Sequence, residues 1–317
     1  YESSHTNFQE IVRNLGYQLR YVTDRMLREG EFDAERYRML ILPRIEALGV
    51  EEAQIIRDFV EAGGVVIADV RPAIYDGHCK PLADGLLDEV FGIDTSGRAA
   101  AAPGTATIGD LTIENAKIDA TVTLTTATAA GEAGGAPVVI TNRFGDGAAV
   151  LLNMDSGSFP KLSTEGAPEA AVELAAELIG RSNVHQPPVS LQAADGARLR
   201  NVECIRWPNG GGEVMALFRL SGNRETATVE LPEARRVYDL RTREDLGTVR
   251  RFTTEIIPNR ATFFGLLPGP VPEATLTQPE FPVNRGAAPA FALSVPGADS
   301  RYAFRIRVTH AGQPLDW

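Results

Sequence analysis

The sequence has few cysteines, no long apolar run and no excess of positive charge, and each absence excludes a class of protein. Its two cysteines, Cys79 and Cys204, lie far apart, so a disulfide-built scaffold is excluded. No C-x-x-C or H-x-x-x-H spacing suggests a zinc site, and we expect neither a metal nor a cofactor. No apolar stretch reaches the roughly 18 residues of a membrane helix. The net charge of −11 argues against nucleic acids and anionic membranes as partners, because both bind basic surfaces.

The overall composition is that of a soluble globular protein. The chain has 317 residues, of which 44% are hydrophobic and 23% charged, which suits two domains and part of a third. The first residue is Tyr1, and no signal-like segment follows it. We therefore interpret the sequence as a piece of a longer protein, whose cellular compartment it does not indicate.

The first 92 residues alternate between helical and strand periodicity. The spacing predicts helices at 5–16, 23–30, 50–64 and 82–92, and strands at 17–22, 38–43 and 65–71. Gly16 is a suitable helix stop, and Thr23 or Asp24 is the expected N-cap of the second helix. Strands separated by helices imply βαβ units, so we expect a flavodoxin-like, three-layer α/β domain with a mostly parallel sheet. Only a few residues precede the first helix, and we expect the domain's first strand to be missing.

Residues 98–155 are rich in Ala, Thr and Gly and contain four strand-like stretches. The sequence Phe144-Gly145-Asp146-Gly147 between two of them predicts a hairpin turn. A helix predicted at 167–182 closes the domain, and residues 185–188 are the expected linker. The acidic pairs Glu51-Glu52 and Asp88-Glu89 fit a helix start and a solvated face.

Beyond residue 189 the pattern predicts strands alone, at the spacing of an antiparallel β-sandwich. Two of these strands flank Gly210-Gly211-Gly212, and Pro268 to Pro272 interrupts the series. The expected domains are an α/β domain at 1–185, a β-sandwich at 186–269 and the start of a further β-rich module at 270–317. Trp207 and Phe218 could form an aromatic platform for a sugar, but we favour positions in the sandwich core.

One loop carries the candidate site residues. The stretch ADVRPAIYDGHCKP (68–81) is a strand running into a polar loop, and open α/β folds place their sites at the carboxyl ends of strands. The candidates for a residual ligand site or a subunit interface are Asp69, Arg71, Tyr75, Asp76, His78 and Cys79. Their simpler roles are structural: Asp69 would accept backbone hydrogen bonds, Arg71 would pair with Asp76 or Asp88, and Tyr75 and His78 would pack the loop.

The order of segments in the first half resembles a known family. The strand LILP, the helix EEAQIIRDFVEAGG running into VVIAD, and the closing DEVFGI resemble the β-galactosidase trimerisation domain, the amidotransferase-like middle domain of family 42 glycoside hydrolases. RFGDGAAVLLNMD resembles the late hairpin of such domains, and the resemblance covers about residues 1–182. The segment VYDLRTREDLGTVRRFTTEIIPNRATFFGLLP resembles, more loosely, the small C-terminal β-sandwich of many glycoside hydrolases.

This resemblance implies an accessory, non-catalytic region of a β-galactosidase-like enzyme. It implies a homo-oligomer, with a trimer as the expected state, and a catalytic (β/α)₈ barrel before Tyr1 that acts on a carbohydrate. The paired carboxylates of glycoside hydrolysis would lie on that barrel. Two alternatives stay open: a Cys79-dependent amidase or peptidase of amidotransferase-like fold, and a carbohydrate-binding module.

The amidase alternative depends on Cys79. Gly77-His78-Cys79-Lys80-Pro81 differs by one residue from G-x-C-x-G, the turn that presents the nucleophile in class I glutamine amidotransferases. A nucleophile elbow needs a strand that ends at the nucleophile and small residues on both sides, yet the strand ends near Arg71. The His-x-Glu of that class, needed to take up the thiol proton, corresponds to LLNMDSGS (151–158), which has no His. We therefore predict an unactivated thiol.

Overall fold

The computed structural model describes residues 2–33, 35–97, 100–162, 167–180 and 189–277, and then 286, 288, 290–295, 309–310 and 313–314. The expected linker at 185–188 lies outside the described residues. The chain divides into two compact units. The first comprises residues 1–205, 216–232 and 250–262, and the second comprises 206–215, 233–249 and 263–317.

The first sheet has seven strands in the order β1-β2-β9-β8-β7-β4-β5. Their bounds in that order are Met39–Leu42, Val65–Asp69, Gly147–Leu152, Ala136–Phe144, Thr128–Ala133, Ala102–Ile108 and Leu111–Ile118. A separate two-stranded pair joins β3 (Ile93–Asp94) to β6 (Thr123–Leu124). The predicted strands 38–43 and 65–71 are adjacent and parallel, as expected, with Ile41 opposite Ile67.

The sheet is mixed, so the prediction of a mostly parallel sheet is wrong. Only the pairs β1–β2 and β2–β9 are parallel, and the pairs from β9 to β5 are antiparallel. The reason is the length of the connections: Phe144 pairs with Gly147 across a two-residue turn, and a turn that short can join only antiparallel strands. The predicted strand at 17–22 is absent, and these described residues form an irregular connection.

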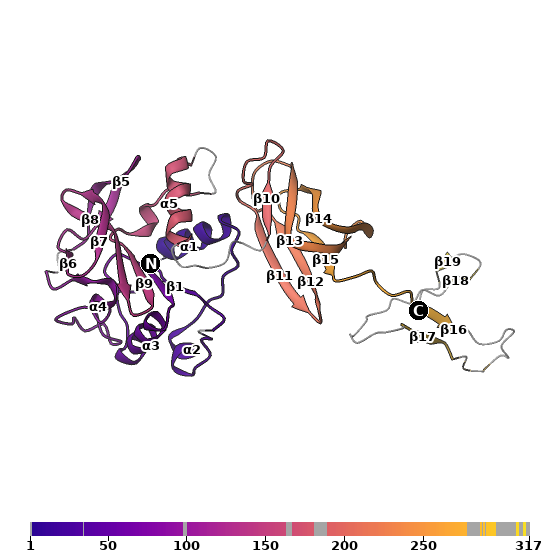
Figure 1. Ribbon diagram of the computed structural model, residues 1–317, viewed down its shortest axis with the longest axis horizontal. Helices are drawn as coiled ribbons and strands as arrows, with labels where there is room; N and C mark the ends of the chain where they lie inside the picture. Colours follow the sequence, from indigo (N-terminus) through magenta and orange to yellow (C-terminus); the bar gives the residue numbers. More distant parts are fainter. Residues whose placement is uncertain are drawn as a thin grey trace. The chain divides into compact units, whose positions relative to one another are not determined.

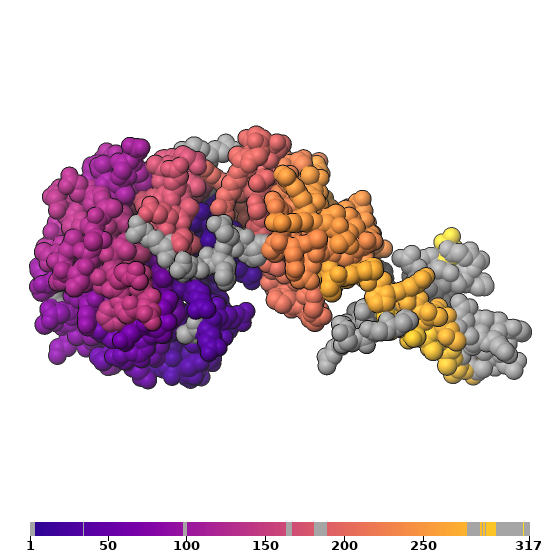
Figure 2. Space-filling model, in the orientation of Figure 1, coloured from indigo at the N-terminus to yellow at the C-terminus, as the bar shows by residue number. Residues whose placement is uncertain are grey.

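Helices cover both faces of this sheet (Figure 1). They are α1 (Glu2–Asn14), α2 (Asp24–Arg28), α3 (Val50–Glu61), α4 (Asp88–Phe91) and α5 (Glu169–Gly180), with a short 3-10 helix η1 at Ser156–Ser158. Apolar residues of α1 and α5 pack on one face, and those of α3 and α4 pack on the other. In the space-filling view the indigo N-terminal segments and the magenta hairpin segments form one continuous body (Figure 2).

Several helix ends follow the predicted local chemistry. The Thr23 hydroxyl accepts the Met26 N–H at 3.2 Å and caps α2, and Gly16 adopts a φ of 82° just after α1. The predicted helix at 82–92 is shorter than expected, because only Asp88–Phe91 is helical and the preceding residues form turns.

Two acidic residues expected on solvated surfaces are buried instead. Glu52 is 4% exposed and pairs with Arg28 of α2, so it connects two helices. Asp88 is 8% exposed and accepts hydrogen bonds from the backbone N–H groups of Gly85 and Thr95 and from the Thr95 hydroxyl. Each carboxylate is buried because a donor from another segment reaches it, which sequence spacing does not reveal.

The second half is all β among the described residues, as predicted. A six-stranded sheet has the order β10-β13-β15-β12-β11, and β14 also pairs with β13. The strands β10 to β15 are Ser190–Gln192, Glu203–Asn209, Gly212–Phe218, Glu225–Asp239, Glu244–Ile256 and Thr262–Leu267. These strands are hydrogen-bonded into one continuous series, and β13 is a single 15-residue strand where two were predicted.

The remaining strands are short pairs, β16 (Thr275–Thr277) with β17 (Ala292–Ser294) and β18 (Thr309–His310) with β19 (Gln313–Pro314). The core of the six-stranded sheet contains Met215, Val237, Phe264 and Leu266. Trp207 is not part of it: this side chain is 46% exposed, which corrects the expectation that it is a core residue.

Candidate functional site

The carboxyl ends of β1, β2 and β9 meet at one edge of the first sheet, because these three neighbouring strands are parallel. Polar side chains gather there. They come from α1, from the ends of the three strands or the residues just after them, and from η1: Ser4, Arg44, Asp69, Asp155 and Ser156. We call these five residues the carboxylate cluster. It lies where open α/β folds place ligand sites.

Asp69 is the centre of the carboxylate cluster and is 1% exposed. Its Oδ2 accepts the Ser4 hydroxyl at 2.5 Å, the Ser156 hydroxyl at 2.8 Å and the Ser156 N–H at 3.1 Å. Its Oδ1 accepts the backbone N–H of Arg44. Burial raises the pKa of Asp69, and the hydrogen bonds from Ser4 and Ser156 oppose this effect without cancelling it.

Asp155 is the second buried carboxylate, at 4% exposure. Its Oδ1 accepts the Gly157 N–H at 2.9 Å and the Ser4 hydroxyl at 3.0 Å, and its Oδ2 accepts Arg44 Nη1 at 3.2 Å. Ser4 therefore bridges two carboxylates, although a hydroxyl has only one proton to donate. Arg44 adopts a left-handed φ of 48°, which is uncommon outside glycine and places its N–H on one carboxylate and its side chain on the other.

The predicted site residues do not form one site. Asp69 is in the carboxylate cluster, whereas Arg71 lies against Asp119, with Nε 3.8 Å from Oδ2. The predicted pairing of Arg71 with Asp76 or Asp88 is therefore corrected. The reason is the left-handed φ of 62° at Arg71, which turns the chain immediately after β2.

Tyr75 to Cys79 form a separate turn. The half-buried Tyr75 has its backbone paired with residues 46 and 48. Asp76 Oδ1 accepts the N–H groups of His78 and Lys80, both at 2.9 Å, and these bonds lower the pKa of Asp76. His78 and Cys79 are exposed, and Cys79 has a φ of 62°. The turn thus presents the thiol to solvent.

The geometry indicates a structural rather than a catalytic role for both the carboxylate cluster and the turn from Tyr75 to Cys79. A catalytic thiol requires a base within hydrogen-bond reach, and in the described part of the chain no hydrogen bond joins the Cys79 sulfur to a histidine. The carboxylates of the cluster are occupied by the chain's own donors. No group of His, Cys, Asp and Glu suited to a metal occurs among the described residues.

Sequence reasoning missed Ser4, Arg44 and Ser156. One signal was present: Asp155-Ser156-Gly157 follows a late strand, and an Asp before a short helix is a typical N-cap. Ser4 lies on a helix far from β2 in sequence, and no local pattern connects the two. Asn153, which stands where a catalytic His was sought, is fully buried and donates to the carbonyls of Asp119 and Pro137 at 2.8 and 2.9 Å.

Residues 23–172 match the sequence profile of the β-galactosidase trimerisation domain. This segment belongs to that family. The trimerisation domain therefore includes β1, α3, β2, the carboxylate cluster apart from Ser4, and the hairpin strands up to β9. The resemblance inferred from the strand LILP and the helix at 50–64 is confirmed.

Solved structures with a similar fold include β-galactosidases, among them Gan42B of family 42. The enzyme of Bacillus circulans sp. alkalophilus matches with a TM-score of 0.62 and 16% identity, over 84% of this chain and 37% of that one. The E323A mutant of Gan42B from G. stearothermophilus matches with a TM-score of 0.62 and 15% identity, over 84% and 36%. The β-galactosidase of Halorubrum lacusprofundi matches with a TM-score of 0.51 and 16% identity, over 85% and 36%.

The chain thus spans little more than a third of the length of these enzymes. No curated protein sequence matches it. None of the helices in the described residues combines the length and apolarity that crossing a bilayer requires.

Proposed function

We propose that this chain is the accessory, oligomerisation region of a β-galactosidase-like glycoside hydrolase, whose catalytic barrel precedes it and acts on a carbohydrate. The observation that carries the proposal is the trimerisation-domain match over residues 23–172. The likeness to family 42 β-galactosidases over more than four-fifths of the chain supports it. We assign residues 1–185 to an amidotransferase-like three-layer domain, 186–269 to a β-sandwich and 270–317 to a further β-rich module.

The proposed role is non-catalytic, and the carboxylate cluster supports this part of the proposal. Glycoside hydrolysis needs two carboxyl groups that reach the scissile bond. Asp69 and Asp155 are 1% and 4% exposed and bind donors from Ser4, Arg44 and Ser156. They hold α1 and three strand ends together, and at these exposures neither carboxyl group is accessible to a substrate.

We restrict the surface proposed for subunit association to side chains that are accessible to solvent. Leu87 and Phe91, apolar residues of the segment that follows the loop at 68–81, are at most 1% exposed and belong to the core under α3, so they are not available to a partner. The residues of the loop that face solvent are Gly77 to Pro81. Since an interface must use accessible side chains, we place it on the turn that contains His78, Cys79 and Lys80, with the half-buried Tyr75 beside it.

Light scattering on the purified chain and on the full-length parent tests this placement. Lys80→Glu combined with His78→Glu reverses or adds charge at the centre of the proposed surface, and we expect the oligomer to dissociate because like charges would be buried. Lys161→Glu is the matched control, since Lys161 is an exposed lysine of the same unit. An oligomer whose mass is unchanged in the double variant would refute the placement, and a monomeric full-length parent would refute association itself.

A Cys79-dependent hydrolase is the second candidate, and one observation favours it. The left-handed φ of Cys79 and the exposure of its side chain are features of nucleophile turns. A nucleophilic thiol would react rapidly with iodoacetamide at pH 6, because it would already be a thiolate. We expect Cys79 to react slowly with iodoacetamide at pH 6, because in the described part of the chain no hydrogen bond joins its sulfur to a base.

A further inference from the structure

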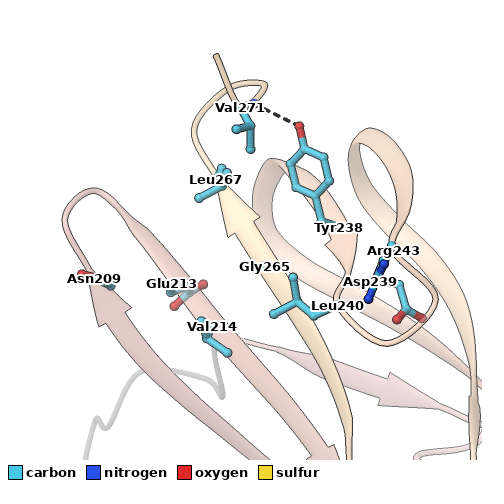
Figure 3. A pocket seen from close by; sticks show the side chains of 10 residues that line it. All are labelled: Asn209, Glu213, Val214, Tyr238, Asp239, Leu240, Arg243, Gly265, Leu267 and Val271. Carbon is cyan, nitrogen blue, oxygen red and sulfur yellow. Dashed lines mark hydrogen bonds between the residues drawn. The ribbon is translucent and has the colours of Figure 1, made fainter. Parts of the chain in front are cut away.

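A cavity of about 410 Å³ opens on the second unit. It is lined by residues of β11, β12, β13, β15 and the segments that follow β13 and β15: Asn209, Glu213, Val214, Tyr238, Asp239, Leu240, Arg243, Gly265, Leu267 and Val271 (Figure 3). Its volume is within the range of about 300–1,000 Å³ that small-molecule sites occupy. We call it the outer-face cavity.

The cavity lies on the face of the six-stranded sheet that is turned away from its core. Side chains alternate between the two faces of a strand. Val237 and Phe264 are fully buried, so their neighbours Tyr238 and Gly265 face the other way, and these two residues are cross-strand partners. Gly265 leaves a gap in the row of side chains across the sheet, and this gap forms the floor of the cavity.

The walls around this floor are apolar and partly open to solvent. Leu240 and Val271 are 48% and 50% exposed. The Val271 N–H donates to the Tyr238 hydroxyl at 3.0 Å, a bond drawn in Figure 3. This bond holds the segment after β15 against the tyrosine ring. Trp207, 46% exposed, is two residues before Asn209 on β11, so both side chains lie on the same face of that strand.

Besides the Tyr238 hydroxyl, four polar side chains stand around the apolar floor, and two of them are fixed by the chain. Glu213 accepts Arg206 Nε at 2.8 Å and Nη2 at 2.5 Å, and Asp239 Oδ1 accepts the N–H groups of Arg241 and Thr242 at 2.7 and 2.9 Å. The Asn209 amide and the Arg243 guanidinium have no side-chain hydrogen bond within the part of the chain that the structure describes. They are the free donors of the cavity.

The charges around the cavity cancel. Glu213 is neutralised by Arg206, and Asp239 is matched by Arg243 at the same turn. A strongly charged ligand of either sign would therefore leave one charge uncompensated. The guanidinium donates, the carboxylates accept and the amide does both, so the set suits a ligand whose groups also donate and accept, as hydroxyls do.

We propose that the outer-face cavity binds a neutral saccharide. A sugar ring presents C–H groups to an apolar floor and hydroxyls to a polar rim, which matches Leu240, Gly265 and Val271 surrounded by Asn209, Asp239 and Arg243. The exposed Trp207 extends the surface on which a second ring can stack. This site is independent of the subunit interface proposed on the turn at 77–81, and it stands or falls separately from it.

Isothermal titration calorimetry on the 317-residue chain tests the proposal, with cellotriose, galactotriose, xylotriose and maltotriose as neutral probes and trigalacturonate as a charged one. We expect at least one neutral probe to bind and trigalacturonate not to bind. Arg243→Asn removes the guanidinium while keeping a residue that tolerates the left-handed φ of 65°. It should weaken binding about tenfold, the effect of losing a charge-assisted hydrogen bond.

A matched pair of leucine variants separates the cavity from the general surface. Leu240→Ala should weaken binding, whereas Leu220→Ala should leave it unchanged, because Leu220 is 67% exposed and does not line the cavity. Binding that is equal in both variants, or no binding of any neutral trisaccharide, overturns the proposal. A change in molecular mass caused by Leu240→Ala but not by Leu220→Ala also overturns it, because the face would then be an interface between copies of the chain.

Discussion

The carboxylate cluster and the outer-face cavity are both places where polar side chains gather beside a sheet, and they use those side chains in opposite ways. In the carboxylate cluster Asp69 accepts four hydrogen bonds from the chain itself and is almost inaccessible to solvent. In the outer-face cavity the Arg243 and Asn209 side chains have open hydrogen-bonding capacity beside half-exposed apolar groups. The first arrangement stabilises the fold, and the second leaves binding capacity for a ligand.

This difference shows that position in a fold does not by itself make a site. The carboxyl ends of parallel strands are the usual ligand position in α/β proteins, yet here α1 supplies Ser4 to that position. The donors that a ligand would provide are already present. No comparable rule places ligand sites on the outer face of the six-stranded sheet. The Asn209 amide and the Arg243 guanidinium nevertheless lie there without a side-chain hydrogen bond to any described residue.

Asp69→Ala should produce the largest loss of stability among the changes at polar residues. It removes the acceptor of the backbone N–H groups of Arg44 and Ser156 and one acceptor of the Ser4 and Ser156 hydroxyls, and each buried group left unpaired costs about 1–3 kcal/mol. We expect the free energy of unfolding, measured by urea denaturation, to fall by at least about 3 kcal/mol. Asp76→Ala is the control: it also removes an aspartate that accepts two N–H groups, but in an exposed turn, where the expected loss is about 1 kcal/mol.

Ser4→Ala should have the next largest effect. Ser4 is fully buried, and its hydroxyl contacts both Asp69 and Asp155. Without it the two carboxylates lose the group between them and α1 loses its bond to β2, so we expect a loss of about 1–3 kcal/mol. Protection of α1 amides against hydrogen exchange should fall in parallel. Unchanged exchange in α1 would show that the cluster does not hold this helix.

The pH dependence of the unfolding free energy tests whether Asp69 is as buried as the carboxylate cluster requires. Burial raises the pKa of Asp69, so the folded state binds this proton more tightly than the unfolded chain, in which the pKa is about 3.9. The resulting stabilisation is complete below that value and is lost as the pH rises through the raised pKa. Relative to Asp69→Asn, the wild type should therefore lose unfolding free energy across this window, by about 1.4 kcal/mol for each unit of pKa difference.

Asp88 titrates in the same direction, because burial raises its pKa as well. The comparison with Asp69→Asn isolates Asp69, since Asp88 is the same in both proteins. A stability difference that stays constant from pH 3 to pH 7 would mean that the carboxylate keeps its usual pKa, and that its hydrogen bonds offset its burial.

Local features of the fold could be predicted from the sequence. The helix at 50–64, the parallel pair 38–43 and 65–71, and the hairpin turn at Gly145-Asp146 depend on spacing, on stop residues and on turn chemistry within a few positions. The prediction of a mostly parallel sheet was wrong for β4, β5, β7 and β8, which are antiparallel to their neighbours, although the short connections between them are visible in the sequence. Connections of two or three residues exclude parallel crossovers, which need a dozen or more residues.

The environments of single polar residues could not be predicted. Glu52 is buried because Arg28 approaches it from another helix, and Arg71 contacts Asp119 because the chain turns sharply after β2. Asp69 was identified as a hydrogen-bond acceptor, but its partners Ser4 and Ser156 lie 65 and 87 residues away in sequence. Such contacts depend on the complete arrangement of strands and helices, and periodicity describes only one element at a time.

Leu240→Ala should have the smallest effect on stability, and this makes it the sharpest test of the contrast. Leu240 is 48% exposed, so its truncation removes part of the contact with Gly265, where a Cβ would lie 3.4 Å from Leu240 Cδ2, and creates no buried void. Large costs of truncation arise from cavities in the core, so we expect a loss within about 0.5 kcal/mol, as for most surface substitutions. Leu266→Ala, one strand position away from Gly265 and 1% exposed, should cost about 2–5 kcal/mol in the same urea titration. If Leu240→Ala destabilised the chain as much as Leu266→Ala, the outer face would be a second core, and its apolar residues would serve folding just as Asp69 does.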